Sequence, residues 1–581
     1  MCLGLRRRGS PPPTDDAAAG DPVLYLGQST APEPPADGDG VSVIDTLAVR
    51  LLADACLELH ARGVVRSMVS VGPVGLARAL HQVASETRAG VDADLAEVPV
   101  LDRKLGTERI LASRTPGRML VVVSRAAESD ARALLEERGV QAARIGAILA
   151  EPRLVVRSAS TILVDLPRDL AIPESGERGR IVDPPPFSAQ AETAAPSLEG
   201  LADSNNPILD LERLLASHAI ASRDWIHGQF DQSAGNGTLL GPNATAAVLR
   251  LRPEAPASAA PGTEGSVPPP PTERFLGVTL HRFSANGATG SREAWKRAVM
   301  RSVGSLACRG AIPVAIVHGV RIAPEPTTSD SVSSNLHEAG DGIVDACRIL
   351  RIPVREHAGD PDARDLRDGV GGSPVVVGAL GIIEKAEHVV TPWFKKDGDA
   401  ILLLGNAVDT NDPLRGLGGS LYLGEVHGRA AAGTPDSDLE AARTLHGALA
   451  GLIQAGGIRS AHDCGAGGLG VALAEACLLH PETRHGHRML GASVDLGELQ
   501  ASCPRLDALF FGESPSRVLV SCDALDAEKI LARARVLGVA ATRLGTVGGD
   551  RLTFKVSGSE SSVVLKELRE LWWNAIGRIV R

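Results

Sequence analysis

Apolar residues along this chain follow two kinds of pattern, and these alternate in the same order near each end. Apolar positions recur every three or four residues over Asp45–Ala61 and again over Asp438–Ala455, which predicts two amphipathic helices. Continuous β-branched runs at Met119–Val123 and Val518–Ser521 predict strands that are buried on both faces. Between helix and strand, each end carries a glycine-rich turn and a second helix. This arrangement predicts one α/β unit that is present twice.

The two ends also match residue by residue, which indicates an internal duplication. GVVRSMVSVGPVGLARAL, from Gly63, aligns without a gap with GGIRSAHDCGAGGLGVAL, from Gly456. A second block, SRTPGRMLVVV, matches ESPSRVLVSC after one small insertion. The paired positions are Gly72 with Gly465, Gly75 with Gly468, Arg118 with Arg517, and Gly146 with Gly545. Because both blocks occur in the same order, chance similarity is a poor explanation.

Proline-rich stretches divide the chain further. Residues 167–196 predict a linker after the first unit, whereas 252–272 predict an enlarged loop inside a middle domain. We therefore predict a tail at 1–20, the remnant of a preceding domain at 21–40, the first unit at 41–166, a linker at 167–204, the middle domain at 205–392, and the second unit with a C-terminal helix at 393–581.

Composition narrows the class of protein. The chain has 581 residues, of which 44% are hydrophobic and 22% charged, as in ordinary globular proteins of several domains. The net charge of −10 arises from interspersed charges, which argues against nucleic acid or a membrane surface as a partner. No apolar run is long enough for a membrane helix. The eight cysteines are scattered without a C-x-x-C pair, which favours a reducing cytoplasm over a disulfide framework or a zinc site.

Three segments carry a family resemblance. They are SAHDCGAGGLGVALAEACL from Ser460, FGESPSRVLV from Phe511, and DWIHGQFDQSAGNGTLLGPNATAAVLRL from Asp224. These resemble motifs of the large subunit (subunit II) of phosphoribosylformylglycinamidine synthase, in the AIR synthase-related, PurM-like superfamily. The resemblance is colinear from about Asp21 to the C-terminus. It implies α/β and α+β domains, with two copies of a C-terminal-type two-layer unit flanking one N-terminal-type, barrel-forming domain.

The resemblance also implies an activity and partners. An enzyme of this family uses ATP and Mg²⁺ in purine biosynthesis to convert formylglycinamide ribonucleotide into its amidine. The chain has no glutaminase segment, so ammonia would come from a separate glutaminase subunit, and a small accessory subunit is also expected. Of the family's first domain only VLYLGQST, from Val23, is expected here. The middle domain would then associate through its open face, either as a homodimer or with a polypeptide that supplies the first domain.

Positions that hold metal or substrate in the family carry other residues here. The substituted positions are Val69, Ser70, Arg114, Thr115, Thr245 and His318. A valine has no ligand atom, and serine is a poorer Mg²⁺ ligand than a carboxylate. No catalytic residue or metal ligand is therefore assigned. Two functions stay open, an ATP-dependent ligase that is complete only in a complex, and a catalytically inactive paralogue that binds a nucleotide or acts as a scaffold or regulator. A start codon upstream of Met1 is a further explanation of the missing domain.

The second unit keeps more polar residues around its glycine-rich turn. Candidate residues for binding a purine-pathway nucleotide or a phosphate are His462, Asp463, Gly465, Gly468, Glu513, Ser514 and Arg517. Glycine-rich backbone turns with nearby charges suit phosphate groups. A structural interpretation is also open, in which His462 and Asp463 form hydrogen bonds within the turn and Arg517 pairs with Glu513.

Overall fold

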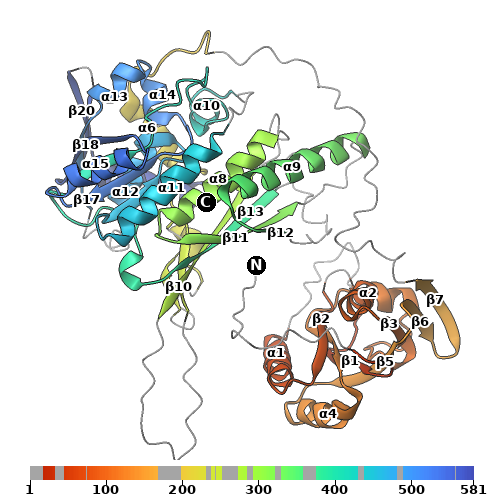
Figure 1. Cartoon of the computed structure of the whole chain (residues 1–581). Coiled ribbons are helices and arrows are strands. Elements are labelled where there is room, and N and C mark those ends of the chain that lie inside the picture. Colours follow the sequence, from red (N-terminus) through yellow and green to blue (C-terminus); the bar gives the residue numbers. More distant parts are fainter. Residues whose placement is uncertain are drawn as a thin grey trace, which may run out of the picture. The chain divides into compact units, whose positions relative to one another are not determined.

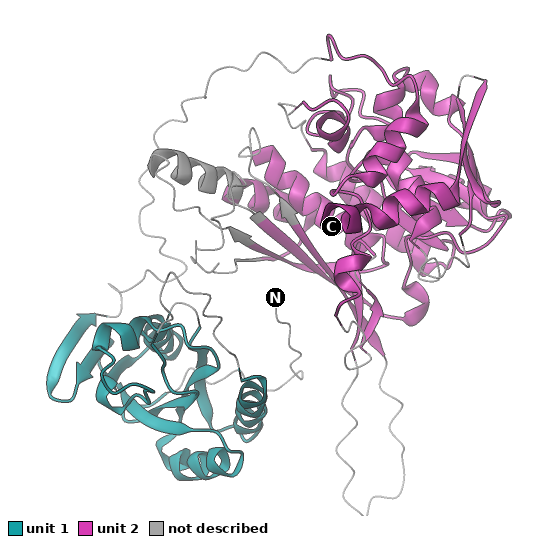
Figure 2. Ribbon diagram, turned by 180° about the vertical axis from the view of Figure 1, so that it is seen from behind, with its two compact units in different colours: residues 1–183, 360–364 teal, residues 184–359, 365–581 magenta. Residues whose placement is uncertain are grey.

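A computed structural model describes most of the chain. The described residues are 17–32, 45–72, 75–167, 198–230, 237–241, 244–251, 273–283, 292–320, 329–356, 375–429, 437–479, 489–556 and 558–580. The chain divides into two compact units, residues 1–183 with 360–364, and residues 184–359 with 365–581 (Figure 2). The expected proline-rich loop at 252–272, and residues 168–197 of the linker expected at 167–204, lie outside the described residues.

The first compact unit is built on a seven-stranded sheet in the order β2-β4-β1-β5-β3-β6-β7. Its strands are β1 (Pro22–Gly27), β2 (Val65–Ser70), β3 (Gly90–Asp94), β4 (Arg118–Val123), β5 (Ala142–Leu149), β6 (Arg153–Ser158) and β7 (Thr161–Pro167). Its helices are α1 (Thr46–Ala61), α2 (Gly75–Thr87), α3 (Thr107–Ala112) and α4 (Glu128–Glu137). Apolar residues of α1 and α4 form one core cluster with the sheet, and those of α2 and α3 form another.

The second compact unit contains a sheet that repeats this order strand for strand, β15-β17-β14-β18-β16-β19-β20. Its strands are β14 (Ala400–Leu404), β15 (Ser460–Asp463), β16 (Ala492–Asp495), β17 (Val518–Cys522), β18 (Ala541–Val547), β19 (Arg551–Val556) and β20 (Ser559–Val564). The helices around it are α10 (Leu421–Glu425), α11 (Leu439–Gln454), α12 (Gly468–Leu478), α13 (Gly497–Ser502), α14 (Leu506–Phe511), α15 (Ala527–Val536) and α16 (Leu565–Val580). The repeated order confirms the duplication.

The register of the two sheets agrees as well. Ser70 pairs with Met119 at the end of β2, and Asp463 pairs with Val518 at the end of β15. The glycine that opens the next helix has φ of +84° at Gly75 and +71° at Gly468. A Cβ at Gly468 would lie 2.7 Å from a backbone oxygen, and one at Gly75 would clash in the same way, so both turns need glycine. The paired glycines are therefore explained by backbone geometry.

One part of the predicted organisation is wrong. The strand that was expected to be a remnant of a separate preceding domain is β1, and it lies in the middle of the first sheet. It pairs antiparallel with β4 on one side and with β5 on the other, as β14 pairs with β17 and β18. Val23, Leu24, Tyr25 and Leu26 are fully buried. This run is apolar because it is a central strand of the first unit.

The middle domain forms a six-stranded sheet in the order β12-β11-β13-β10-β9-β8. Its strands are β8 (Thr238–Leu240), β9 (Ala247–Leu251), β10 (Arg274–Phe283), β11 (Ile312–Val320), β12 (Val354–Glu356) and β13 (Val375–Ile383). Its helices are α6 (Pro207–Ala216), α7 (Asp224–His227), α8 (Arg292–Ala307) and α9 (Ser329–Leu350), of which α8 and α9 lie side by side against the sheet (Figure 1). A continuous apolar core joins this domain to the second sheet.

The middle sheet is covered unequally on its two faces. Phe275 and Thr279 of β10 are buried toward α8, whereas Leu280 on the opposite face is 61% exposed. On β11, Ile312 and Val314 are 47% and 41% exposed. This outer face is apolar and lies open in the described part of the chain.

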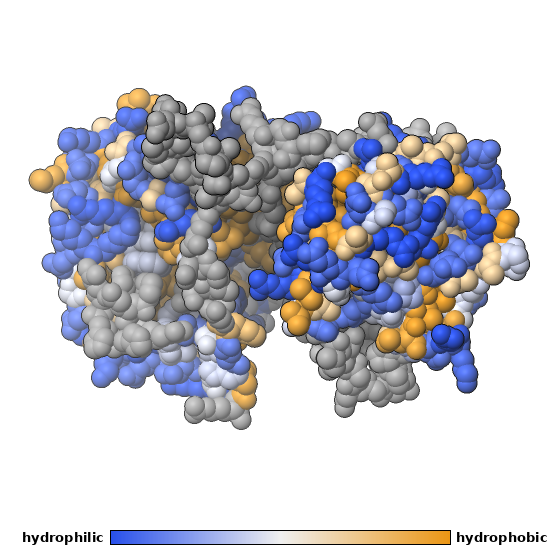
Figure 3. Space-filling model, turned by 90° about the horizontal axis from the view of Figure 1, so that it is seen from below, coloured by the Kyte–Doolittle hydropathy of each residue, from blue (hydrophilic) through white to orange (hydrophobic). Residues whose placement is uncertain are grey.

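The remaining surface is mixed. Hydrophilic residues are widespread among the residues that Figure 3 colours by hydropathy, and apolar residues form separate patches between them. Among the helices that the structure describes, none is both long enough and apolar enough to span a membrane.

Candidate functional site

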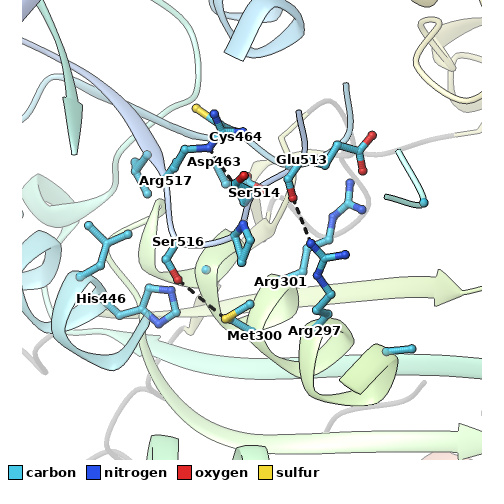
Figure 4. Close-up of a pocket in the computed structure, with 17 residues that line it drawn as sticks. Arg297, Met300, Arg301, His446, Asp463, Cys464, Glu513, Ser514, Ser516 and Arg517 are labelled. Atoms are coloured by element: carbon cyan, nitrogen blue, oxygen red, sulfur yellow. Dashed lines mark hydrogen bonds between the residues drawn. The ribbon is translucent and has the colours of Figure 1, made fainter. Parts of the chain in front are cut away.

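A cavity of about 240 Å³ lies where α8 of the middle domain meets the second repeat (Figure 4). Helices α8 and α11, the turn after β15 and the loop after α14 form its walls. Five of the seven residues proposed from the sequence line it: Asp463, Gly465, Glu513, Ser514 and Arg517. His462 and Gly468 are not part of its wall. The fold thus brings together most, though not all, of the candidate residues.

Arg517 is bound to the loop itself. Its side chain is 3% exposed and donates from Nε to the Ser514 carbonyl oxygen at 3.1 Å. Nη1 donates to the Ala407 oxygen at 2.6 Å, and Nη2 donates to the Gly512 oxygen. Within the described residues it forms no ion pair with Glu513, so the expected pairing of these two side chains is wrong. The guanidinium holds the loop in shape instead.

The matching arginine of the first unit does the same. Arg118 is 1% exposed and donates from Nε to the Thr115 oxygen and from Nη2 to the Ser113 oxygen, both at 2.6 Å. Its Nη1 lies 3.2 Å from the Thr30 hydroxyl. In both copies the acceptors lie three and five residues before the arginine. The repeated arginine is therefore a structural feature of the loop.

Glu513 also has a structural task. Its Oε1 accepts hydrogen bonds of 2.9 Å from the backbone N–H of Leu421 and of Gly467, so it fixes the start of α10 and the glycine-rich turn. Its backbone oxygen accepts from Arg297 Nη2 at 3.4 Å. A carboxylate held by two N–H donors is restrained in position.

His462 points away from the cavity into the core. Its Nδ1 lies 2.8 Å from the Asp463 carbonyl oxygen, and its Nε2 lies 3.0 Å from a carboxylate oxygen of Glu475 on α12. Burial lowers the pKa of His462, but the contacts with Glu475 and Asp463 outweigh this effect, and the net pKa is raised. His462 therefore joins β15 to α12, which agrees with the structural interpretation of this residue.

The groups left for a ligand are Asp463 and two arginines of α8 that sequence reasoning missed. Arg297 and Arg301 lie one helical turn apart and both line the cavity. Asp463 Oδ1 and Arg301 Nε are both buried and have no hydrogen-bond partner among the described residues. A Cβ on Gly465 would lie 2.9 Å from Asp463 Oδ2 and 3.3 Å from Arg301 Nε, so the two side chains flank one point. They form no ion pair in the described structure.

Two histidines near this point are held neutral. Burial lowers the pKa of His446, on α11, to about 4, although Asp463 opposes the shift. Burial also lowers the pKa of His281, on β10, to about 4, helped by Arg301 and opposed by Asp463. Burial lowers the pKa of Arg297 as well, opposed mainly by Glu513. The positive charge of the cavity therefore comes from arginines.

Comparisons with known proteins identify the family. The model of "AIR synthase related protein, C-terminal domain" matches residues 24–158 and 396–557. The phosphoribosylformylglycinamidine synthase subunit PurL of Thermosynechococcus vestitus is 31% identical over 605 residues, which cover 98% of this chain and 75% of the relative. The chain belongs to the PurL family.

Solved structures agree with the PurL fold. The T. maritima PurL structure titled as complexed with AMPPCP has a TM-score of 0.58 and 18% identity, covering 92% of this chain and 72% of its own. A second structure, titled T. maritima PurL complexed with FGAR, has a TM-score of 0.58 and 16% identity, covering 92% and 73%. These matches confirm the multidomain architecture that the resemblance implied.

The substituted PurL positions of the first unit lie in ordinary surroundings. Val69 is 2% exposed in the core, and Ser70 ends β2 at the place that Asp463 takes in the second unit. Arg114 stands where the second unit has Glu513. Thr115 Oγ1 accepts from the Ala31 N–H at 2.8 Å. The first unit thus has neither of the two acids that face α8 in the second.

The remaining two substituted positions, Thr245 and His318, lie in the middle domain. Thr245 Oγ1 is buried without a hydrogen-bond partner in the described part of the chain. His318 lies on β11 opposite Val377 of β13.

The residues present do not suit the Mg²⁺ of the PurL family. Among the described residues, no group of three or more His, Cys, Asp or Glu side chains is placed to hold a metal ion. Mg²⁺ prefers several oxygen ligands in octahedral geometry. Asp463 instead faces the guanidinium of Arg301, and Arg297 lies one turn away. The described cavity is therefore not a magnesium site.

Proposed function

We propose that this chain acts as the PurL-type component of a phosphoribosylformylglycinamidine synthase. The observation that carries the proposal is the 31% identity with a PurL subunit over 98% of the chain. The repeated α/β units and the middle domain follow that relationship in order. Solved structures with the same fold include T. maritima PurL complexed with AMPPCP and with FGAR, which supports ATP and formylglycinamide ribonucleotide as substrates.

The reaction requires activation of a poor electrophile. The γ-phosphoryl group of ATP is transferred to the amide oxygen of the substrate, and ammonia then attacks the amide carbon while phosphate leaves. Positioning and electrostatic stabilisation account for most of the catalysis of such transfers. Mg²⁺ would neutralise charge on the triphosphate when bound, although the described residues form no cluster that would hold it.

For the second repeat we propose binding of a nucleotide or a phosphate. Its support is the cavity, which is lined by Asp463, Gly465, Glu513, Ser514 and Arg517. Arg517 and Glu513 would contribute by shaping the loop, because the three guanidinium nitrogens of Arg517 and Oε1 of Glu513 already have partners within the protein. Asp463 lines the cavity, and its Oδ1 has no hydrogen-bond partner among the described residues, so this atom is left for a ligand.

We further propose that the working enzyme is an assembly in the cytoplasm. The similar protein is named a subunit, which supports partners, including a separate glutaminase as the source of ammonia and a small accessory subunit. The open apolar face of the middle sheet, with Leu280, Ile312 and Val314, supports association there. Its occupant would be a second copy of the chain or a different polypeptide. Light scattering after size-exclusion chromatography tests the homodimer, and a clean monomer would refute it.

The activity is tested by ADP release with ATP, Mg²⁺, formylglycinamide ribonucleotide and ammonium. Omitting the ribonucleotide is the control for ATP hydrolysis without substrate. Substrate-dependent turnover by the purified chain, or by the chain with its glutaminase and accessory subunits, supports the proposal. The inactive paralogue is favoured if adding the ribonucleotide gives no additional ADP, both with the purified chain alone and with the chain and its subunits together.

A further inference from the structure

The two arginines of the cavity come from one face of α8. Arg297 and Arg301 are four residues apart, so their side chains are neighbours on the helix surface. Two like charges at this spacing repel each other, and partial burial strengthens that repulsion. Glu513 and Asp412 offset the charge of Arg297, and Asp463 lies near Arg301. An anion between the two guanidinium groups would relieve the repulsion.

The groups around Gly465 add a second requirement for the ligand. Asp463 Oδ1 needs a donor, and Arg301 Nε needs an acceptor, and neither finds one among the described residues. Both side chains flank the same point without joining in an ion pair. A hydroxyl group can satisfy both, since it donates to a carboxylate and accepts from a guanidinium.

Cavity size limits the part of the ligand that the cavity encloses. The volume of about 240 Å³ lies below the range of roughly 300–1,000 Å³ that is usual for pockets of drug-sized ligands. A triphosphate is normally held together with Mg²⁺, and the described residues provide no cluster for that ion. Met300, Leu445 and Pro515 give part of the wall an apolar character that suits the carbon face of a small ring. The cavity therefore favours one phosphate group on a compact body.

We propose that this cavity binds a small phosphate monoester that carries hydroxyl groups, such as a pentose phosphate, with Arg297 and Arg301 on the phosphate and Asp463 on a hydroxyl. The inference rests on the proposed phosphate-binding role of the second repeat and narrows its ligand. It also moves the recognition of the anion from the loop arginine, Arg517, to two residues of the middle domain. A ligand held in this way bridges α8 and the second repeat.

Isothermal titration calorimetry of the full chain with ribose 5-phosphate, inorganic phosphate and ATP tests the proposal. Ribose 5-phosphate is expected to bind more tightly than either of the others. Arg301→Gln should weaken this binding by about tenfold or more, since a charge-assisted hydrogen bond is lost. Arg348→Gln is the matched control, because Arg348 lies on α9 with a side chain that is 76% exposed. That variant should bind within about twofold of the wild type.

A second variant separates the hydroxyl from the phosphate. Asp463→Asn should remove the preference for ribose 5-phosphate over inorganic phosphate while phosphate itself still binds. Thermal unfolding of each variant establishes that it is folded. The proposal is overturned if ATP binds most tightly and Arg301→Gln abolishes that binding. It is equally overturned if no phosphate compound binds the wild type, or if Arg301→Gln binds ribose 5-phosphate as the wild type does. None of these results depends on ligase turnover, so the two proposals can fail separately.

Discussion

His462 Nε2 lies 3.0 Å from a carboxylate oxygen of Glu475, and this contact joins the end of β15 to the middle of α12. Of the two adjacent polar residues at the turn, one therefore faces the core, and only Asp463 faces the cavity. The opposite orientations follow from the strand, in which successive side chains point to opposite faces. The two residues of the conspicuous His-Asp pair accordingly have separate roles.

The contact between His462 and Glu475 predicts a pH-dependent loss of stability. The pKa of His462 is raised in the folded protein, so its protonated form stabilises the fold below the ordinary histidine pKa, and this contribution disappears as the pH rises through the folded pKa. We expect Glu475→Gln to lower the free energy of unfolding by about 2 kcal/mol at pH 5.5 and by less at pH 8.5. Urea unfolding at the two pH values measures the difference. An equal loss at both would show that the pair is not charged.

The paired loop arginines predict that the same substitution lowers the free energy of unfolding equally in the two repeats. Arg118→Lys and Arg517→Lys each remove a planar donor group that serves three acceptors, and a lysine cannot replace its geometry. Each should cost about 3 kcal/mol of unfolding free energy in its own compact unit, measured by urea unfolding. Arg138→Lys is the control, because the Arg138 side chain is 47% exposed and its ion pair lies at the surface. A loss at Arg517 alone would contradict the shared role.

The scaffold was predictable because its signals are local. A glycine at Gly75 or Gly468 is dictated by a positive φ and a close backbone oxygen, and Arg118 and Arg517 bond to carbonyl groups within five residues. Such requirements leave the same residue in both copies. The order of helices and strands was predictable for the same reason, since periodicity reports burial.

The cavity was less predictable because long-range packing creates it. Arg297 and Arg301 read as ordinary polar positions of an amphipathic helix, and nothing in the local pattern shows that α8 packs beside the turn after β15. The position of β1 was not predicted for the same reason, because it depends on long-range strand pairing. Its apolar run predicted a buried strand, but its neighbours in the sheet lie some hundred residues further along the chain. The local pattern of α8 therefore carried no signal for the two arginines.

In the second repeat, replacing a glycine by alanine is predicted to destabilise the protein at the glycine-rich turn and to stabilise it within α11. Gly468→Ala would place a Cβ 2.7 Å from the Gly512 oxygen at a φ of +71°, so we expect a loss of about 3 kcal/mol. Gly447 lies within α11 with open space around its missing Cβ. Gly447→Ala should stabilise the protein by up to about 1 kcal/mol through helix propensity. Thermal unfolding of both variants tests the pair, and a tolerated Gly468→Ala would show that the turn can relax.

The contribution of His446 to the free energy of unfolding is predicted to change with pH in the opposite direction to that of His462. Its pKa in the folded protein is about 4, below the ordinary value, so the unfolded chain binds more protons between pH 4 and about 6.5. The wild type should therefore lose stability as the pH falls through that window, by at most about 3 kcal/mol from this residue. His446→Asn removes the titrating group, so part of the loss should disappear.

The test compares unfolding free energies at pH 5.0 and pH 7.5 for the wild type, His446→Asn and His462→Asn. At pH 7.5 the His446→Asn protein should be somewhat less stable than the wild type, because the smaller side chain leaves a gap beside Gly304. At pH 5.0 that deficit should shrink or reverse, whereas the deficit of His462→Asn should grow. Parallel changes in the two variants would contradict the opposite environments of these histidines. Burial alone would lower both pKa values, so the divergence measures the contribution of Glu475.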